Sequence, residues 1–206
     1  MKLKPKAKKT SNMYDSVFLL ETMREKRFLV LLFFFLFTHC FCCLAQNTSL
    51  EKVQSNRFKR LYQLNDSVYR SEQPSKKGFK ELEALGVKTS ITFRRNKDDV
   101  KKARGTALEL IHLPLKTAEL TEKDIVNALR AIKDAKKPVL VHCWHGSDRT
   151  GAIMAAYRVV FENWSKEDAI SELRKPELGY HEKWYPNVIE LISNLHKKQI
   201  TKELGL

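Results

Sequence analysis

Cys143 and Arg149, separated by five residues, are the pair whose types and spacing point most directly to chemistry. They follow the apolar run 138–142 (PVLVH) and precede a helical pattern that begins at Thr150. A loop between a strand and a helix presents unpaired backbone N–H groups at the positive end of the helix dipole. Such a loop binds phosphate and favours the thiolate of a cysteine at its start. The spacing therefore predicts that Cys143 attacks a phosphoryl group while Arg149 binds its oxygens.

The other residues of this loop are of types that suit the same chemistry. A planar guanidinium six residues after the cysteine can make two bonds to phosphate oxygens once the loop curls. Gly146 relieves the tight turn midway. His142 is expected to orient the loop by hydrogen bonding, and the Thr150 hydroxyl to stabilise the departing thiolate. The predicted catalytic residues are Cys143, Asp148, Arg149 and Thr150; the predicted substrate-binding residues are Trp144, His145, Gly146, Ser147, Asp148 and Arg149, with Trp144 and His145 at the mouth of the pocket.

The elements that must position the loop alternate between strand and helix patterns. Strands are predicted at 67–70, 87–93, 108–115 and 138–142, and helices at 74–85, 97–104, 121–135, 150–161, 165–174 and 186–198. Thr121 and Asp124 fit a capping box. Residues 46–65 are expected to form a polar lead-in. The alternation predicts one α/β domain with a central, mostly parallel sheet flanked by helices, and 138–142 as a strand buried on both faces.

The residues from His142 to Thr150 match the HC-x5-R-[ST] pattern of the protein tyrosine and dual-specificity phosphatase superfamily. Residues 69–75 (YRSEQPS) and 85–89 (LGVKT) resemble two further motifs of its bacterial dual-specificity-like subgroup, which includes exported members. The resemblance covers roughly residues 67–195. It implies a protein tyrosine phosphatase-like fold and a two-step reaction, in which Cys143 forms a phosphocysteine intermediate that is then hydrolysed. It implies no metal and no organic cofactor.

The sequence departs from this resemblance at the general acid. Many members of the superfamily carry an Asp on a mobile loop some thirty residues before the cysteine, whereas residues 113–120 (LPLKTAEL) contain none. Asp148 is the first candidate for the acid and Glu119 the second, with water as the remaining source of the proton. Asp124 is expected to be engaged in capping its helix. The alternative role for Asp148 is structural: its carboxylate would tie the loop by accepting backbone N–H bonds.

Residues outside the loop give weaker signals. Arg70, Arg94 and Arg95 are candidates for adding positive potential near the phosphate, although each is expected by default to be a solvated surface residue. His181 and Trp184 are expected to pack rather than to react.

The N-terminus has the features of an export signal. Residues 28–36 (FLVLLFFFL) follow a basic flank and lead to small residues that end at Ala45, as in a secretory signal peptide. We expect an extension and signal at 1–45, a phosphatase domain at 46–206, and a periplasmic mature protein; an uncleaved membrane anchor is the alternative. The start codon is open between Met1, Met13 and Met23. Cleavage would remove three of the four cysteines and leave Cys143.

The net charge of +14 raises the question of an anionic partner. No zinc-finger spacing or nucleic-acid-binding motif is present in the sequence, so we predict a phosphorylated substrate rather than nucleic acid, and a monomer. Three functions fit. They are hydrolysis of phosphotyrosine or mixed phosphoproteins, hydrolysis of a small polyphosphorylated molecule such as an inositol phosphate or phosphoinositide, and phosphate binding without catalysis, which would ordinarily have lost the cysteine or the arginine.

Overall fold

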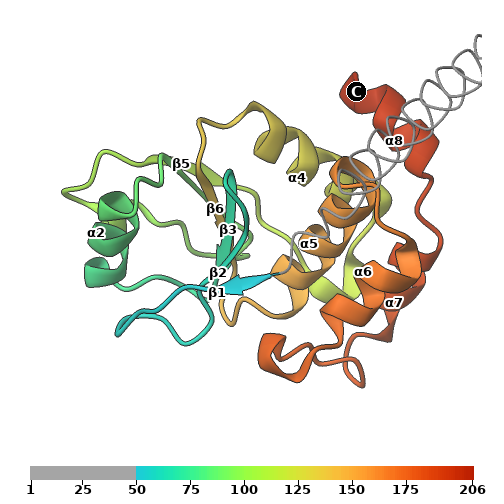
Figure 1. Cartoon of the computed structure of the whole chain (residues 1–206), viewed down its shortest axis with the longest axis horizontal. Helices are drawn as coiled ribbons and strands as arrows, with labels where there is room; N and C mark the ends of the chain where they lie inside the picture. The colour runs from blue at the N-terminus through green and yellow to red at the C-terminus, as the bar shows by residue number, and fades with distance from the viewer. Residues whose placement is uncertain (1–49) are drawn as a thin grey trace, which may run out of the picture. The chain divides into compact units, whose positions relative to one another are not determined.

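Six strands form one sheet in the order β1-β2-β3-β6-β4-β5 (Figure 1). The computed structural model describes residues 50–206. The neighbouring pairs among β3, β6, β4 and β5 are parallel, whereas β1 and β2 are antiparallel to their neighbours. The strands are β1 Glu51–Lys52, β2 Tyr62–Asn65, β3 Val68–Ser71, β4 Thr89–Thr92, β5 Glu109–His112 and β6 Val139–His142. The predicted α/β fold with a mostly parallel sheet is confirmed.

Strand β6 occupies the centre of the parallel part, and all four of its residues are buried. Its last residue, His142, lies opposite Ser71 on β3 and Thr92 on β4. The carboxyl ends of three parallel strands therefore meet where the Cys143 loop begins. This edge of an open parallel sheet is where α/β proteins bind their ligands.

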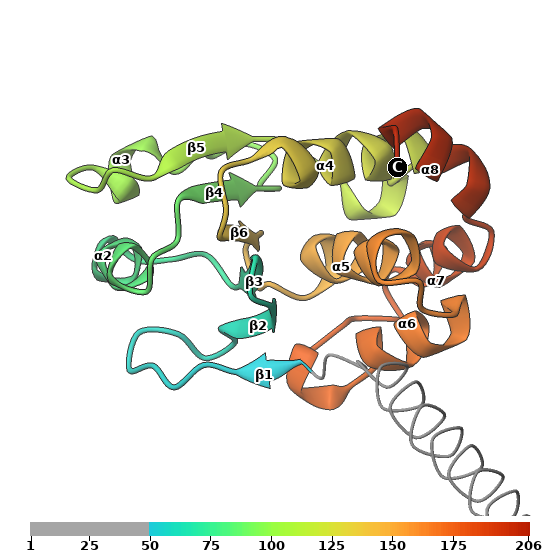
Figure 2. The ribbon, with the colours of Figure 1, turned by 45° about the horizontal axis from the view of Figure 1, so that its top comes forward.

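Helices cover both faces of the sheet (Figure 2). Helix α2 and the short helix α3 lie on one face, and α4 to α8 lie on the other. Helix α5, which follows the loop directly, is buried along most of its length, as a central helix between sheet and outer helices must be. The bounds are α2 Lys76–Ala84, α3 Val100–Ala103, α4 Glu122–Asp134, α5 Asp148–Phe161, α6 Lys166–Leu173, α7 Pro186–Ser193 and α8 Lys197–Leu204, with 3-10 turns η1 Thr117–Glu119 and η2 Pro176–Leu178.

Four predictions about the elements need correction. The lead-in contains β1 and β2, because β2 pairs along the free edge of β3 and β1 pairs with β2. Helix α2 begins after the Ser75 cap rather than at Pro74. It ends at Ala84, and Leu85 is its exposed C-cap residue. The charged helix is only one turn long. The last helix is split before His196, where Leu195 turns into the core.

The capping box of Thr121 and Asp124 at the start of α4 is confirmed, with both reciprocal bonds present. No helix within residues 50–206 is long and apolar enough to cross a membrane. The predicted signal segment at 1–45, with Cys40, Cys42 and Cys43, lies outside the described residues. The domain boundary at 46 stays a prediction.

Candidate active site

The loop 143–147 joins β6 to α5, and the helix begins two residues earlier than the sequence indicated, at Asp148. Cys143 lies at the bottom of the loop with 2% of its surface exposed. The first helical bond of α5 runs from the Gly151 N–H to the Ser147 carbonyl. Within the described chain, no backbone N–H of residues 144–150 donates a hydrogen bond. The loop and the first turn of α5 therefore hold seven free N–H donors at the positive end of the helix.

The direction of these N–H groups is fixed from outside the loop. A trans peptide unit directs its C=O and the next N–H to opposite sides. Anchoring the carbonyls on the outside therefore turns the following N–H groups inward. Three carbonyls have such anchors: His142 Nδ1 lies 3.2 Å from the Cys143 oxygen, the Gln73 N–H donates to the Trp144 oxygen at 3.1 Å, and Arg70 Nη2 donates to the Gly146 oxygen at 2.7 Å.

Gly146 is required by the approach of the loop to β3. Its φ of +73° is in the left-handed region. A Cβ atom there would lie 2.5 Å from the Ser71 carbonyl oxygen, which is backbone and cannot move aside. The sequence analysis attributed this glycine to the tight turn. The close approach of the loop to β3 is a second reason.

Arg149 and Thr150 contribute the two side-chain polar atoms that are buried without a partner among the described residues. Arg149 Nη1 donates to the Phe93 carbonyl at 3.1 Å, but its Nε has no acceptor. Unpaired buried polar atoms are costly and uncommon in folded proteins. Two of them on adjacent residues, six and seven positions after a buried cysteine, indicate groups that are held ready for a ligand.

His142 is buried and held by a carboxylate that the sequence analysis missed. Its Nε2 lies 2.6 Å from Asp99 Oδ2, and Asp99 has only 1% of its surface exposed. Burial alone would raise the pKa of Asp99, but the hydrogen bond and charge of His142, with hydrogen bonds from Gln73 and Ser90, lower it. Asp99 lies in the charged stretch 97–104, which was predicted only to be a helix. Nothing in the sequence of that stretch indicates that Asp99 is buried.

The mouth of the loop is built from aromatic rings and Arg94. Trp144 is half exposed, and the Arg94 guanidinium lies 4.4 Å over its ring. Arg94 also donates to the Gln73 side chain at 2.8 Å, which links the mouth to the Asp99 cluster. His145 is exposed beside Trp144.

Asp148 faces the segment after α6. Its Oδ1 accepts the His181 backbone N–H at 2.9 Å and lies 3.0 Å from His181 Nδ1. The His181 ring stacks on Trp184 with centroids 5.2 Å apart, although Trp184 itself stays 74% exposed. Packing of Trp184 is thus confined to that stack. The carboxylate of Asp148 therefore accepts a backbone N–H bond, which is the structural role that the sequence analysis gave as the alternative to acid catalysis.

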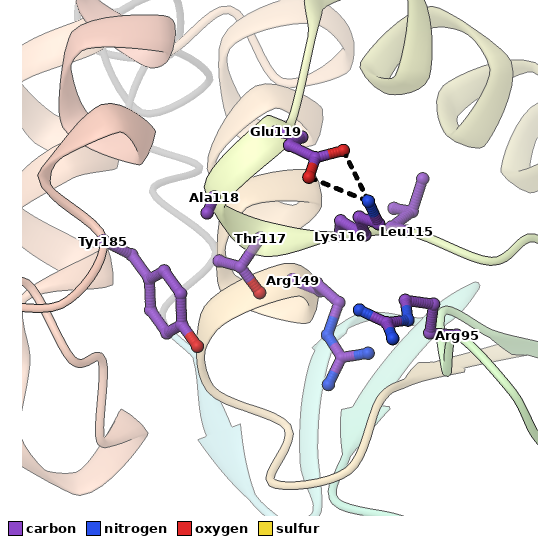
Figure 3. Close-up of a pocket in the computed structure, with 8 residues that line it drawn as sticks. All are labelled: Arg95, Leu115, Lys116, Thr117, Ala118, Glu119, Arg149 and Tyr185. Carbon is purple, nitrogen blue, oxygen red and sulfur yellow. Dashed lines mark hydrogen bonds and ion pairs between the residues drawn. The ribbon is translucent and has the colours of Figure 1, made fainter.

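A cavity of about 330 Å³ opens next to Arg149 (Figure 3). In this view Arg95 and Tyr185 stand on opposite sides of Arg149, and the turn η1 forms the roof. Lys116 Nζ binds both Glu119 carboxylate oxygens at 2.8 Å. The lining residues are Arg95, Leu115, Lys116, Thr117, Ala118, Glu119, Arg149 and Tyr185. Glu119, the second candidate acid, therefore borders the cavity, and Asp148 does not.

Arg70, Arg94 and Arg95 were candidates for adding positive potential near the phosphate, and each lies in a different environment. Arg95 is exposed and borders the cavity, and Arg94 is half-buried over Trp144. Arg70 is 2% exposed, so the expectation of a solvated surface residue is wrong for it. The reason is its strand: β3 lies between β2 and β6, and all four of its residues are buried.

Within residues 50–206, no group of three or more His, Cys, Asp or Glu side chains is placed to hold a metal ion.

The comparisons with known proteins agree with this geometry. Residues 43–183 match the model of a family described as DSP-PTPase phosphatase fused to NAD+ kinase. The dual specificity protein phosphatase TpbA of Pseudomonas aeruginosa is 34% identical over 122 residues, covering 58% of this chain and 55% of TpbA. The inositol diphosphatase DSP5 of Arabidopsis thaliana is 25% identical over 127 residues, covering 54% of this chain and 59% of DSP5.

Solved structures show the same fold. Crystal structures of P. aeruginosa TpbA and of its cysteine-to-serine variant in complex with phosphotyrosine superpose with TM-scores of 0.70 and 0.69 at 24% and 23% identity. They cover 78% of this chain and 99% and 98% of those chains. The chain spans somewhat more than half the length of the curated relatives it matches. Because the family model matches well over half of its 206 residues, the chain belongs to the DSP-PTPase family, within the cysteine-dependent protein tyrosine and dual-specificity phosphatase superfamily.

Proposed function

We propose that this protein hydrolyses phosphomonoesters through a phosphocysteine intermediate. The observation that carries the proposal is the loop 143–150, in which seven free N–H donors and the unpaired Nε of Arg149 surround a buried cysteine. These donors fit the equatorial oxygens of a phosphoryl group, and such preorganised donors lower the barrier to its transfer.

The reaction follows from the positions of these groups. The Cys143 thiolate attacks phosphorus, the bond from phosphorus to the ester oxygen breaks, and that oxygen takes up a proton as the alcohol or phenol leaves. Water then attacks the phosphocysteine, the P–S bond breaks, and inorganic phosphate leaves. The buried Thr150 hydroxyl, which has no partner within residues 50–206, supplies a hydrogen bond to the thiolate as it departs.

For the proton donor, the geometry gives Glu119 more support than Asp148. Glu119 borders the cavity beside Arg149, where a leaving group would lie. Its carboxylate is turned toward Lys116 in Figure 3, so it must leave that exposed ion pair to reach the ester oxygen. Exposed pairs of this kind are worth about 1 kcal/mol or less, so this rearrangement is easy. The Asp148 carboxylate is already engaged by His181.

The first candidate substrate is a phosphotyrosine or dual-specificity phosphoprotein. TpbA is named a dual specificity protein phosphatase, and its fold binds phosphotyrosine in a crystal structure. The aromatic mouth formed by Trp144 and His145 suits a phenyl ring. The second candidate is a small polyphosphorylated molecule, because Arg95 and Lys116 place two further cations in the cavity beside Arg149. DSP5, named an inositol diphosphatase, is a relative of this second kind.

The test is turnover by the full chain and two variants on phosphotyrosine peptides, phosphoserine peptides and inositol phosphates. Cys143→Ser is expected to lower turnover by roughly 10⁴-fold or more while phosphate still binds, because the N–H cradle and Arg149 remain. Arg149→Lys is expected to lower kcat by about 10²–10³-fold, because an ammonium cannot make the bidentate contact. More than trace activity in Cys143→Ser would remove Cys143 as the nucleophile, and the preferred substrate of the wild type selects between the two classes.

We also propose that the protein is exported and acts in the periplasm as a monomer. Support comes from the basic flank, the apolar run 28–36 and the small residues up to Ala45.

A further inference from the structure

Arg70 is a buried charged residue that the reaction described above does not use. It lies on β3 opposite Val141 of β6, which is two residues before Cys143, and 2% of its surface is exposed. Its Nη2 donates to the Gly146 carbonyl at 2.7 Å. A Cβ atom at Gly151 would lie 3.8 Å from the same nitrogen. The guanidinium therefore sits directly beneath the loop, against the first turn of α5.

The charge of Arg70 has no carboxylate of its own. The charged and titratable groups that face it are Tyr62 from β2, Arg158 from α5, Glu172 from α6 and Cys143 from the loop. Glu172 uses both of its oxygens on Arg158, at 3.0 and 2.9 Å. Within residues 50–206 Arg70 forms no ion pair.

Burial lowers the pKa of Arg70 to about 10, against the opposing attraction of Glu172 and Cys143. It is therefore still a cation at neutral pH. A buried cation without a partner is unfavourable unless a negative charge comes close. Arg70 supports the loop that begins at Cys143, so a thiolate at Cys143 would be such a charge.

We propose that Arg70 is a positioning residue of the active site, which fixes the Gly146 peptide so that the Ser147 N–H points into the phosphate cradle and supplies a buried positive charge that favours the Cys143 thiolate. The proposal rests on the phosphocysteine function for its purpose. The two effects are separable, because one depends on a hydrogen bond and the other on a charge.

Cys143 also faces other cations, so the contribution of Arg70 has to be isolated. Arg94 interacts with it from the β4 side, and Arg149 follows it in the first turn of α5. Arg70 differs from these in being beneath the loop, where substrate does not reach it. Changes at Arg70 therefore act on the free enzyme, before any substrate binds.

The experiment measures the pH midpoint of iodoacetamide alkylation of Cys143 in the full chain, followed by mass spectrometry of the peptide that contains it. Arg70→Gln keeps a donor without charge and is expected to raise the midpoint by about one pH unit, the usual size of such a charge effect. Arg70→Lys keeps the charge and is expected to leave the midpoint within a few tenths of a unit, while inorganic phosphate binds more weakly because the fork is lost.

A control variant and a second measurement keep the result interpretable. Arg130→Gln removes a guanidinium that donates to the Glu203 carbonyl rather than to the loop, and is expected to leave the midpoint and phosphate binding unchanged. Where Arg70→Gln does not fold, phosphate binding by Arg70→Lys still tests the hydrogen bond to the Gly146 carbonyl, and is expected to be weaker than in the wild type.

An unchanged midpoint in a folded Arg70→Gln, an equal rise in Arg70→Lys or Arg130→Gln, or phosphate binding by Arg70→Lys as tight as by the wild type would each overturn the proposal. Alkylation needs no turnover, so these outcomes are read independently of phosphatase activity. A wild type that alkylates as proposed but hydrolyses no phosphomonoester would contradict the proposed function alone.

Discussion

At the scale of residues, the first question is whether Glu119 donates the proton to the leaving oxygen. Glu119→Gln is expected to slow hydrolysis of an alkyl phosphate, a poor leaving group, by about 10²–10⁴-fold and to remove the basic limb of its pH–rate profile. It is expected to spare p-nitrophenyl phosphate, whose phenolate leaves without much help. The measurement is kcat/KM for both substrates across pH.

Asp148→Asn is the matched control for this prediction. Because Asp148 accepts the His181 N–H, its change is expected to slow both substrates alike by loosening the loop. Selective slowing of the alkyl phosphate in Asp148→Asn would return the acid role to Asp148. If neither variant is selective, water supplies the proton.

At the scale of elements, the one-turn helix α3 matters because it carries Asp99 to His142. Asp99→Asn is expected to reduce the free energy of unfolding at neutral pH by about 2 kcal/mol, the usual worth of hydrogen bonds to a charged group. The folded-state pKa of Asp99 is lowered, so its contribution is present above the unfolded value of about 3.9 and is lost as the pH falls through the folded value. Denaturant unfolding at several pH values measures the difference.

The control is Asp98→Asn, which changes the adjacent, exposed carboxylate that accepts only the Val100 N–H among the described residues. It is expected to have a much smaller effect at every pH. A wild-type advantage over Asp99→Asn that grows below pH 4 would contradict the assigned sign of the Asp99 shift.

The elements also show what the sequence could predict. The strand, loop and helix around Cys143 are contiguous, so residue types at fixed offsets were enough to predict the cradle, the Gly146 turn and Arg149. The supports of the loop come from far along the chain: Asp99 is 43 residues from His142, and Arg70 is 76 residues from Gly146. No local pattern records such pairs, which is why Arg70 was read as a solvated residue and Asp99 only as part of a helix at 97–104. The antiparallel strand β2 was missed for the same reason, since its pairing with β3 is tertiary.

For the whole molecule, the proposed export has a consequence for the nucleophile. The chain has four cysteines, and a cut after Ala45 leaves Cys143 as the last one. A single thiol cannot form an intrachain disulfide in an oxidising compartment. A thiolate enzyme is therefore chemically compatible with the periplasm once the signal is removed.

Mass spectrometry of the native protein is expected to show an N-terminus near Gln46. Translation from Met1 or Met23 would give the same mature mass, because cleavage removes the difference between the two starts. Phe34→Arg, which places a charge in the centre of the apolar run, is expected to leave the segment attached and the protein in the cytoplasmic fraction, because a charge there opposes insertion. A native protein that retains residues 28–45 and stays with the membranes would instead establish the uncleaved anchor.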